Sequence, residues 1–300
     1  MKIDLRDIGL LMLSGFTQLQ CREICEATLG YKLSRINLYR NQAKYLVDWC
    51  HKYNLFIDCS DFYVQEFVCE EGKGNWSNQG EKTFDTNGCK FYYISRNKDE
   101  VQLAKSAEVK EEFDAKLMGN LLKIPECCTE NYLVNREVVE KKYFDDYAII
   151  TTKNTLNSSG MFNANWKTNY LSQYFGYSLI HHFPCTWNCQ NTIDRADKSI
   201  EIMNSVSPNW VKTFQENLRG LLVFENGLSV HFIKALPETG AKEVLFKPHQ
   251  IVSTNTTELS KKLREYGNIK WNSPFSFNIR ELEDLSKYHN LEETTVIPFI

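Results

Sequence analysis

The stretches His181-His182-Phe183-Pro184-Cys185-Thr186-Trp187-Asn188-Cys189 and Ile124-Pro125-Glu126-Cys127-Cys128 hold four of the ten cysteines and two of the six histidines of the chain. In each stretch a proline just before the first cysteine restricts the backbone. Proline is favoured at the first position of a helix, so the stretch at 124–128 predicts a helix from Glu126 to about Lys142. Helical spacing after Cys189 predicts another helix there. The sequence therefore places the cysteines of both stretches at or just before the start of a helix.

The rest of the chain alternates between helical and strand-like segments without a regular βα rhythm. The spacing of apolar residues predicts further helices over 17–29, 34–50, 97–122 and 210–218. Aromatic and β-branched runs predict strands over 55–57, 62–68, 89–94, 147–152, 221–224, 228–233 and 244–246. Residues 72–87 and 154–166 are predicted as polar loops, and Glu225-Asn226-Gly227 as a hairpin turn. We therefore expect an α+β fold of mixed helices and short antiparallel strands, without a Rossmann-type sheet.

Bulk composition is that of an ordinary globular protein, with 300 residues, 42% hydrophobic and 24% charged. We expect an N-terminal helical and strand region over 1–96 and a cysteine-motif region over 97–300, packed as one globular unit. A net charge of −3 gives no electrostatic reason to bind nucleic acid or an anionic membrane. There is no apolar run of about 18 residues and no signal-peptide pattern, so we expect a cytoplasmic protein.

The first turn of a helix presents unpaired N–H groups and partial positive charge, which stabilise a thiolate. Cys127 and Cys128 lie in such a turn, about 100° apart around the helix. At most one of them is therefore expected to face any given point. The other either packs or serves as a second thiol for redox chemistry.

The later stretch brings an imidazole and two thiols within eight positions. A C-x3-C spacing at a helix start turns Cys185 and Cys189 toward one face. The extended Phe183-Pro184 link lets His182 reach the same point. With one cysteine of the earlier doublet, this set of three thiolates and one histidine suits tetrahedral zinc or an iron–sulfur cluster. The alternative is that these are core cysteines beside a helix cap, with a histidine bonded to a backbone carbonyl.

Both stretches resemble motifs of a prokaryotic family described only as a domain of unknown function. Its members carry a G-Y-P-x-C-C turn and a later H-x-P-C-S-x-x-C stretch. In this chain Lys123-Ile124 replaces the usual Gly-Tyr and Thr186 replaces Ser, while the cysteines are kept. The resemblance implies a shared site and favours His182 over His181 as its histidine, but it implies no particular activity.

Other candidate groups carry weaker signals. Glu130 follows Glu126 by one turn and is a candidate acid or base beside the cysteines. Cys21 and Cys25 also have the C-x3-C spacing, yet two small residues on a half-buried helix face explain them equally well. His231 alternates with apolar residues in a predicted strand and is interpreted as a hydrogen-bonded core histidine.

These residues favour a metalloenzyme with zinc or an iron–sulfur cluster held by Cys127, Cys128, His182, Cys185 and Cys189. Its substrate would be a small molecule or a modified peptide, and its chemistry sulfur or redox chemistry. The candidate catalytic groups are Cys127, Cys128, His182 and Glu130. One alternative is a metal-free enzyme with a cysteine nucleophile, and another is a non-catalytic protein with a structural zinc site.

Overall fold

The computed structural model describes residues 2–66, 80–109, 113–143, 146–159, 163–238, 242–279 and 294–300. Contacts divide the chain into two compact units. The first contains the described parts of Met1–Phe67, Gly80–Leu133 and Asp194–Lys212, and the second those of Val134–Ile193 and Thr213–Ile300. The division of the sequence at residue 96 stays a prediction.

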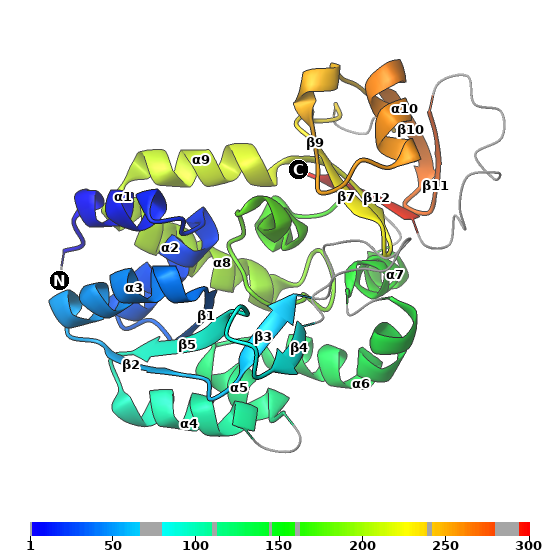
Figure 1. Cartoon of the computed structure of the whole chain (residues 1–300). Helices are drawn as coiled ribbons and strands as arrows, with labels where there is room; N and C mark the ends of the chain where they lie inside the picture. Colours follow the sequence, from blue (N-terminus) through cyan, green and yellow to red (C-terminus); the bar gives the residue numbers. More distant parts are fainter. Residues whose placement is uncertain are drawn as a thin grey trace. The chain divides into compact units, whose positions relative to one another are not determined.

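The first unit is built from helices and two small antiparallel sheets (Figure 1). Its helices are α1 (Leu5–Leu13), α2 (Gln18–Thr28), α3 (Arg40–Tyr53), α4 (Lys98–Val109) and α5 (Ala115–Leu121). Its strands are β1 (Ser34–Leu38), β2 (Phe56–Cys59), β3 (Tyr63–Glu66), β4 (Gly80–Thr83) and β5 (Lys90–Ser95). One sheet has the order β1-β5-β2, and β3 pairs with β4. Helices α6 (Glu126–Lys142), α8 (Gln190–Val206) and α9 (Pro208–Leu218) contribute residues to both units.

Helix α2 follows the sequence signals closely. Thr17 and Gln20 form a capping box at its start. Gly30, with φ +72°, follows its end. The helix predicted from Ser34, by contrast, is wrong in its first turn. Residues 34–38 alternate buried and less buried positions and form β1, and α3 begins only at Arg40.

A buried ion cluster joins α2 to the strand that follows it. Arg22 donates to Glu23 and Glu26, at 2.5 Å each, and Lys32 also contacts Glu23. Burial alone would raise the pKa of Glu26, but the cations outweigh it and lower that pKa to about 2. Arg195 of α8 reaches the same carboxylate at 3.2 Å. Removing one member would leave a buried charge unpaired, which is strongly destabilising.

The second unit contains α7 (Ala148–Ser159), α10 (Glu258–Tyr266) and two antiparallel sheets (Figure 1). The four-stranded sheet has the order β12-β6-β7-β9, with β6 (Gly220–Glu225), β7 (Ser229–Ile233), β9 (Ile251–Ser253) and β12 (Thr294–Phe299). The three-stranded sheet has the order β11-β10-β8, with β8 (Glu243–Leu245), β10 (Asn268–Ser273) and β11 (Ser276–Asn278). Apolar residues of both sheets and of α10 form one core. The predicted hairpin at Asn226-Gly227 is confirmed.

The strand predicted over 147–152 is wrong, because these residues open helix α7. Asp146 accepts from the backbone N–H of Ala148 at 2.8 Å, which helps to start the helix. The hydroxyl of Thr155 donates to the carbonyl of Thr151 at 2.7 Å, which suits a threonine inside a helix. Residues 154–159, predicted as the first part of a loop, therefore belong to α7.

Most other predicted elements are confirmed. The single helix predicted over 97–122 is wrong, because α4 ends at Val109 and Asp114 caps the start of a second helix, α5. The loop predicted over 72–87 contains strand β4, and its residues 72–79 lie outside the described part, as do residues 67–68 of a predicted strand. The ladders between the named strands are antiparallel, so the expected α+β class without a Rossmann-type sheet is confirmed for the described residues. No helix in this part of the chain is long and apolar enough to cross a membrane.

Candidate metal centre

The turn before α6 sets the position of the first two cysteines. The carbonyl of Pro125 accepts from the N–H groups of Cys128, at 2.9 Å, and Thr129, at 3.0 Å, so the helix starts where the sequence predicts. Helix α5 passes close by at Gly119, where a Cβ atom would lie 2.8 Å from Thr129 Oγ1. Glycine at this position therefore allows the approach of the two helices.

Helix α7 holds the backbone of the cysteine segment at residues 181–189. The hydroxyl of Thr151 donates to the carbonyl of Pro184 at 2.8 Å. The side-chain amide of Asn154 donates to the carbonyl of Cys185 at 3.0 Å. These bonds fix the segment on both sides of the Pro184–Cys185 peptide. The sequence prediction missed them because it took this helix for a strand.

The segment is anchored further by Trp187, which is fully buried. Its backbone N–H donates to Thr155 Oγ1 at 2.8 Å and its indole N–H to Thr152 Oγ1 at 2.9 Å. Its ring stacks on Tyr170, with ring centroids 5.5 Å apart. Thr151, Thr152 and Thr155 lie at positions i, i+1 and i+4 of α7. That spacing is the sequence signal that could have identified them as one polar face.

Cys189 stands directly before the first residue of α8. Its carbonyl accepts the first helical hydrogen bond, from the N–H of Ile193 at 3.0 Å. Its own N–H donates to the carbonyl of Thr186 at 3.2 Å, closing the turn after Cys185. Cys185 and Cys189 are thus joined by a tight turn leading into a helix, as the sequence predicts.

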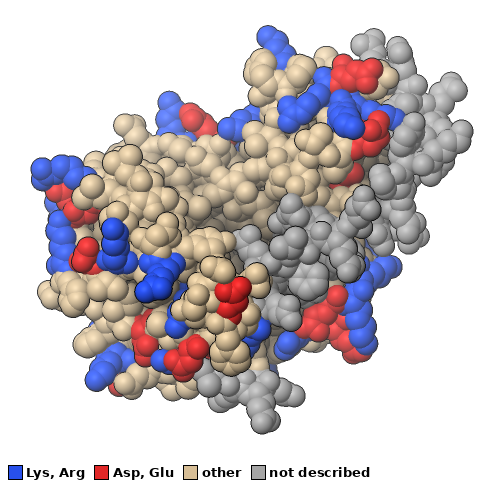
Figure 2. All heavy atoms as spheres, viewed as in Figure 1, with Lys and Arg blue, Asp and Glu red and all other residues tan. Residues whose placement is uncertain are grey.

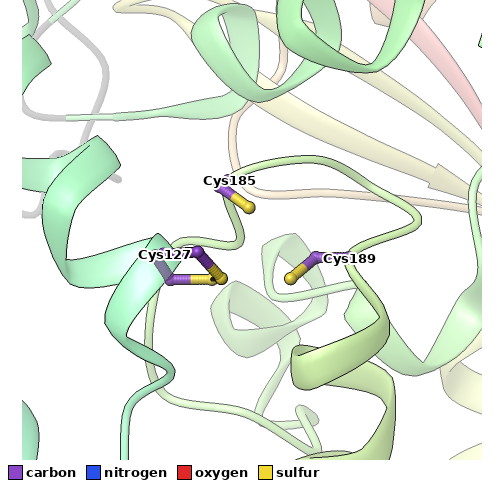
Figure 3. Close-up of side chains that lie close together, drawn as sticks. Cys127, Cys185 and Cys189 are labelled. Atoms are coloured by element: carbon purple, nitrogen blue, oxygen red, sulfur yellow. Dashed lines mark hydrogen bonds between the residues drawn. The ribbon is translucent and has the colours of Figure 1, made fainter. Parts of the chain in front are cut away.

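Four sulfurs come together at one point. The Sγ atoms of Cys127, Cys128, Cys185 and Cys189 all lie within 4.8 Å of one another. Figure 3 shows the side chains of Cys127, Cys185 and Cys189 directed toward a common space. The predicted meeting of sulfurs from two distant segments is confirmed, and these four cysteines can hold a metal ion.

The expectation that only one of Cys127 and Cys128 would face this point is wrong. Both sulfurs belong to the group, and they lie 3.9 Å apart. The angle of about 100° between neighbouring residues describes Cα–Cβ directions, whereas the position of each sulfur also depends on rotation about χ1. A disulfide needs about 2.05 Å, so the two sulfurs are not bonded to each other.

The four ligand candidates differ in burial. Cys128 and Cys189 are 1% and 8% exposed, whereas Cys127 and Cys185 are half-buried. Two of these cysteines are therefore enclosed by protein, and the other two are partly exposed.

His182 and Glu130 are not members of the four-sulfur group. His182 is buried, and its Nε2 lies 3.1 Å from Thr192 Oγ1 in the first turn of α8. Glu130 is exposed on α6. Their predicted roles as metal ligand and as acid or base stay predictions.

Comparisons with known proteins give no relative. No family model, curated protein or solved structure matches this chain.

On the face shown in Figure 2, basic and acidic residues are interspersed, and neither sign forms a large patch.

Proposed function

We propose that this chain is a zinc protein, in which Cys127, Cys128, Cys185 and Cys189 hold one Zn²⁺ as a tetrahedral tetrathiolate. The proposal depends on one observation, the mutual approach of the four sulfurs within 4.8 Å. Zinc–sulfur bonds of about 2.3 Å in a tetrahedron separate neighbouring sulfurs by about 3.8 Å. The 3.9 Å between the sulfurs of the doublet matches that edge.

The same distances favour a single metal ion over a cluster. In a [4Fe–4S] cluster each cysteine binds an outer corner of a cube, and its sulfurs are separated by roughly 6 Å. The sulfurs here lie closer than that. A mononuclear iron site has nearly the same size as zinc, so colour separates these two metals and distance does not.

The charge of such a centre is partly offset by its surroundings. Four thiolates and Zn²⁺ carry a net charge of −2, which is costly to bury without compensation. Cys127 and Cys128 lie in the first turn of α6, and Cys189 directly precedes α8. Both helix starts present the positive end of the helix dipole, which stabilises anionic ligands. This arrangement supports binding of deprotonated cysteines.

Four cysteine ligands leave no open coordination position, which is typical of structural zinc. We therefore propose a structural centre that fixes the start of α6 to the turn before α8. The motifs shared with the resembled prokaryotic family contain these same cysteines, and we propose that the family has the same centre.

Metal analysis of the purified protein tests this proposal. We expect one zinc per chain, no visible colour, and intense d–d bands of tetrahedral sulfur coordination after replacement by Co²⁺. Cys189→Ser should lose the metal. Cys59→Ser, which changes a half-buried cysteine outside the group, should keep it. A protein without zinc, or a coloured iron protein, would contradict the proposal.

A catalytic centre is the second candidate, favoured by the half-burial of Cys127 and Cys185. A small molecule or a modified peptide could reach these two sulfurs, and a metal-bound thiolate remains a nucleophile. Alkylation of Cys127 or Cys185 in the zinc-loaded protein, with the zinc retained, would favour this candidate. Complete protection of all four cysteines while zinc is bound would favour the structural centre.

A further inference from the structure

A second polar cluster lies in the four-stranded sheet of the second unit and involves none of the cysteines. It consists of Glu225 on β6, His231 on β7 and Ser253 on β9. His231 Nε2 lies 2.5 Å from Glu225 Oε2, and His231 Nδ1 lies 2.9 Å from Ser253 Oγ. A carboxylate, an imidazole and a hydroxyl thus follow one another in hydrogen-bonding contact.

The strand register creates this order. His231 and Ser253 are paired directly across β7 and β9. The ladder bonds of these strands include Thr254 N–H to Val230 O and Lys234 N–H to Gln250 O, so 231 and 253 form a non-hydrogen-bonded pair. Side chains approach most closely at such pairs. The serine hydroxyl is thereby held against the imidazole.

The carboxylate fixes the proton of the imidazole. An ionised carboxylate accepts hydrogen bonds and donates none, so Nε2 of His231 carries the proton toward Glu225. In neutral histidine the other nitrogen, Nδ1, then has a lone pair. The hydroxyl of Ser253 donates to this lone pair, and Nδ1 is the basic nitrogen.

Thr257 is a second hydrogen-bond partner of Glu225. The hydroxyl of Thr257 donates to Glu225 Oε2 at 2.6 Å. Thr257 is the N-cap of α10, so the start of that helix lies beside the carboxyl group. Glu225 and His231 are 1% and 0% exposed, whereas Ser253 is half-buried. Of the three residues, Ser253 is the one that is partly exposed.

We propose that Ser253 is a nucleophile for acyl transfer from carboxylic esters, with His231 as its general base and Glu225 as the residue that positions His231. Nucleophile and base within about 3 Å, with the base oriented by a third group, are the signature of an activated hydroxyl.

The reaction balances with these groups and water. Ser253 Oγ bonds to the ester carbonyl carbon while its proton moves to His231 Nδ1. The bond between that carbon and the alcohol oxygen breaks, and the proton passes from Nδ1 to the departing alcohol. Water then gives a proton to His231 Nδ1 and bonds to the acyl carbon. The bond between that carbon and Ser253 Oγ breaks, the proton passes from Nδ1 to Oγ, and the carboxylic acid is released.

The sheet edge supplies a donor for the developing negative charge. Strand β9 is the outer strand beside β7. Since 253 is a non-hydrogen-bonded position of that pair, the N–H of Ser253 is directed away from β7. An N–H of the nucleophile itself commonly stabilises the oxyanion in acyl transfer.

Labelling of the purified, zinc-replete protein with a fluorophosphonate tests the proposal. We expect one adduct, located at Ser253 by mass spectrometry, formed at least about 100-fold faster than at the exposed Ser276. Ser253→Ala should abolish both the label and the hydrolysis of 4-nitrophenyl acetate. Ser276→Ala should change neither.

Glu225→Gln separates positioning from mere packing. It should slow labelling of Ser253 by at least about 100-fold, and the ¹⁵N shifts of His231 should report a changed tautomer while the fold is kept. An unlabelled Ser253 in the folded wild-type protein would overturn the proposal. So would hydrolysis that continues unchanged in Ser253→Ala. The labelling and hydrolysis experiments use variants that keep all the cysteines. Their failure would therefore contradict the role of Ser253 and would leave the zinc proposal unaffected.

Discussion

Two pairs of cysteines in this chain share the same C-x3-C spacing and have different surroundings. Cys21 and Cys25 lie inside α2 and are 0% exposed. Cys185 and Cys189 flank a turn at the start of α8, next to two further sulfurs. Burial raises the pKa of Cys21 from the ordinary 9.0 to about 12, and raises that of Cys25 well above its usual range. The first pair consists of inert core thiols, and the second of candidate ligands.

The difference shows that spacing alone does not define a metal site. Within a helix, positions i and i+4 share a face, but that face can be wholly apolar. At a helix start, unpaired N–H groups favour the thiolate, and the preceding turn brings the residues together. The useful signal in this sequence is a cysteine pair combined with a proline and a helix start.

The largest effect should come from deleting a ligand. Cys189→Ser should lower zinc affinity by at least about 100-fold and the free energy of unfolding by about 5 kcal/mol or more, because zinc binding contributes directly to folding. Cys25→Ala should cost about 1 kcal/mol and leave zinc stoichiometric. Metal analysis and urea unfolding measure both. If Cys189→Ser and Cys25→Ala lost zinc equally, Cys185 and Cys189 would not differ from Cys21 and Cys25 as zinc ligands.

Thiol reactivity should separate the pairs nearly as strongly. After zinc is removed by a chelator, iodoacetamide at pH 8 should modify Cys127 and Cys185, which are half-buried. The pKa of Cys21, about 12 rather than 9.0, reduces its thiolate fraction by roughly 10³. Mass spectrometry of the digested protein gives the rate at each site. Modification of Cys21 before unfolding would contradict the comparison.

The sequence predicted the site better than the elements around it. Pro125 correctly placed the start of α6, and the convergence of two distant cysteine segments followed from residue types. Helix α7 was missed because Ile149, Ile150 and Thr151 have high strand propensity, and burial in tertiary contacts overrides such preferences. A short apolar run cannot by itself distinguish a strand from a buried helix.

The side chains that complete each cluster were also beyond sequence reasoning. Participation of both Cys127 and Cys128 depends on side-chain rotation, which a helical wheel does not contain. The contact of His231 with Ser253 depends on the register of β7 and β9, which are separated in the sequence by β8, and the strand of Ser253 was not predicted. The residue types predicted which two segments would bring cysteines together. Only the packing of the folded chain showed which side chains lie next to these cysteines.

The two pairs should respond to pH in opposite directions. Below pH 9 Cys21 is protonated in both the folded and unfolded chain. Between pH 9 and 12 the unfolded chain releases this proton while the folded chain keeps it, so stability falls as pH rises, by up to about 4 kcal/mol. Cys21→Ala should lose less stability over this range than the wild type. Zinc should instead dissociate on acidification, as protons compete for the thiolates. Unfolding and metal release measured against pH test both directions.

A smaller effect is expected from the helix that holds the ligand turn. Thr155→Val removes the acceptor for the N–H of Trp187 and should lower zinc affinity by about 10- to 100-fold, the usual cost of losing an outer contact of a metal site. Asn157→Ala, on the exposed side of the same helix, is the matched control. Competition with a chromophoric chelator measures both variants. Equal affinities would mean that the turn holds its geometry without α7.

The smallest effect tests whether the ligand set is complete with four sulfurs. His182→Gln should leave zinc content unchanged, because His182 lies outside the group of sulfurs and its Nε2 contacts Thr192. Loss of that hydrogen bond should lower the free energy of unfolding by about 1 kcal/mol. Glu130→Gln, at an exposed position on α6, should change neither quantity.

If the His182→Gln protein lost zinc while Cys127→Ser or Cys128→Ser retained it, the centre would have three thiolates and one imidazole. One member of the doublet would then be left as a thiol available for chemistry.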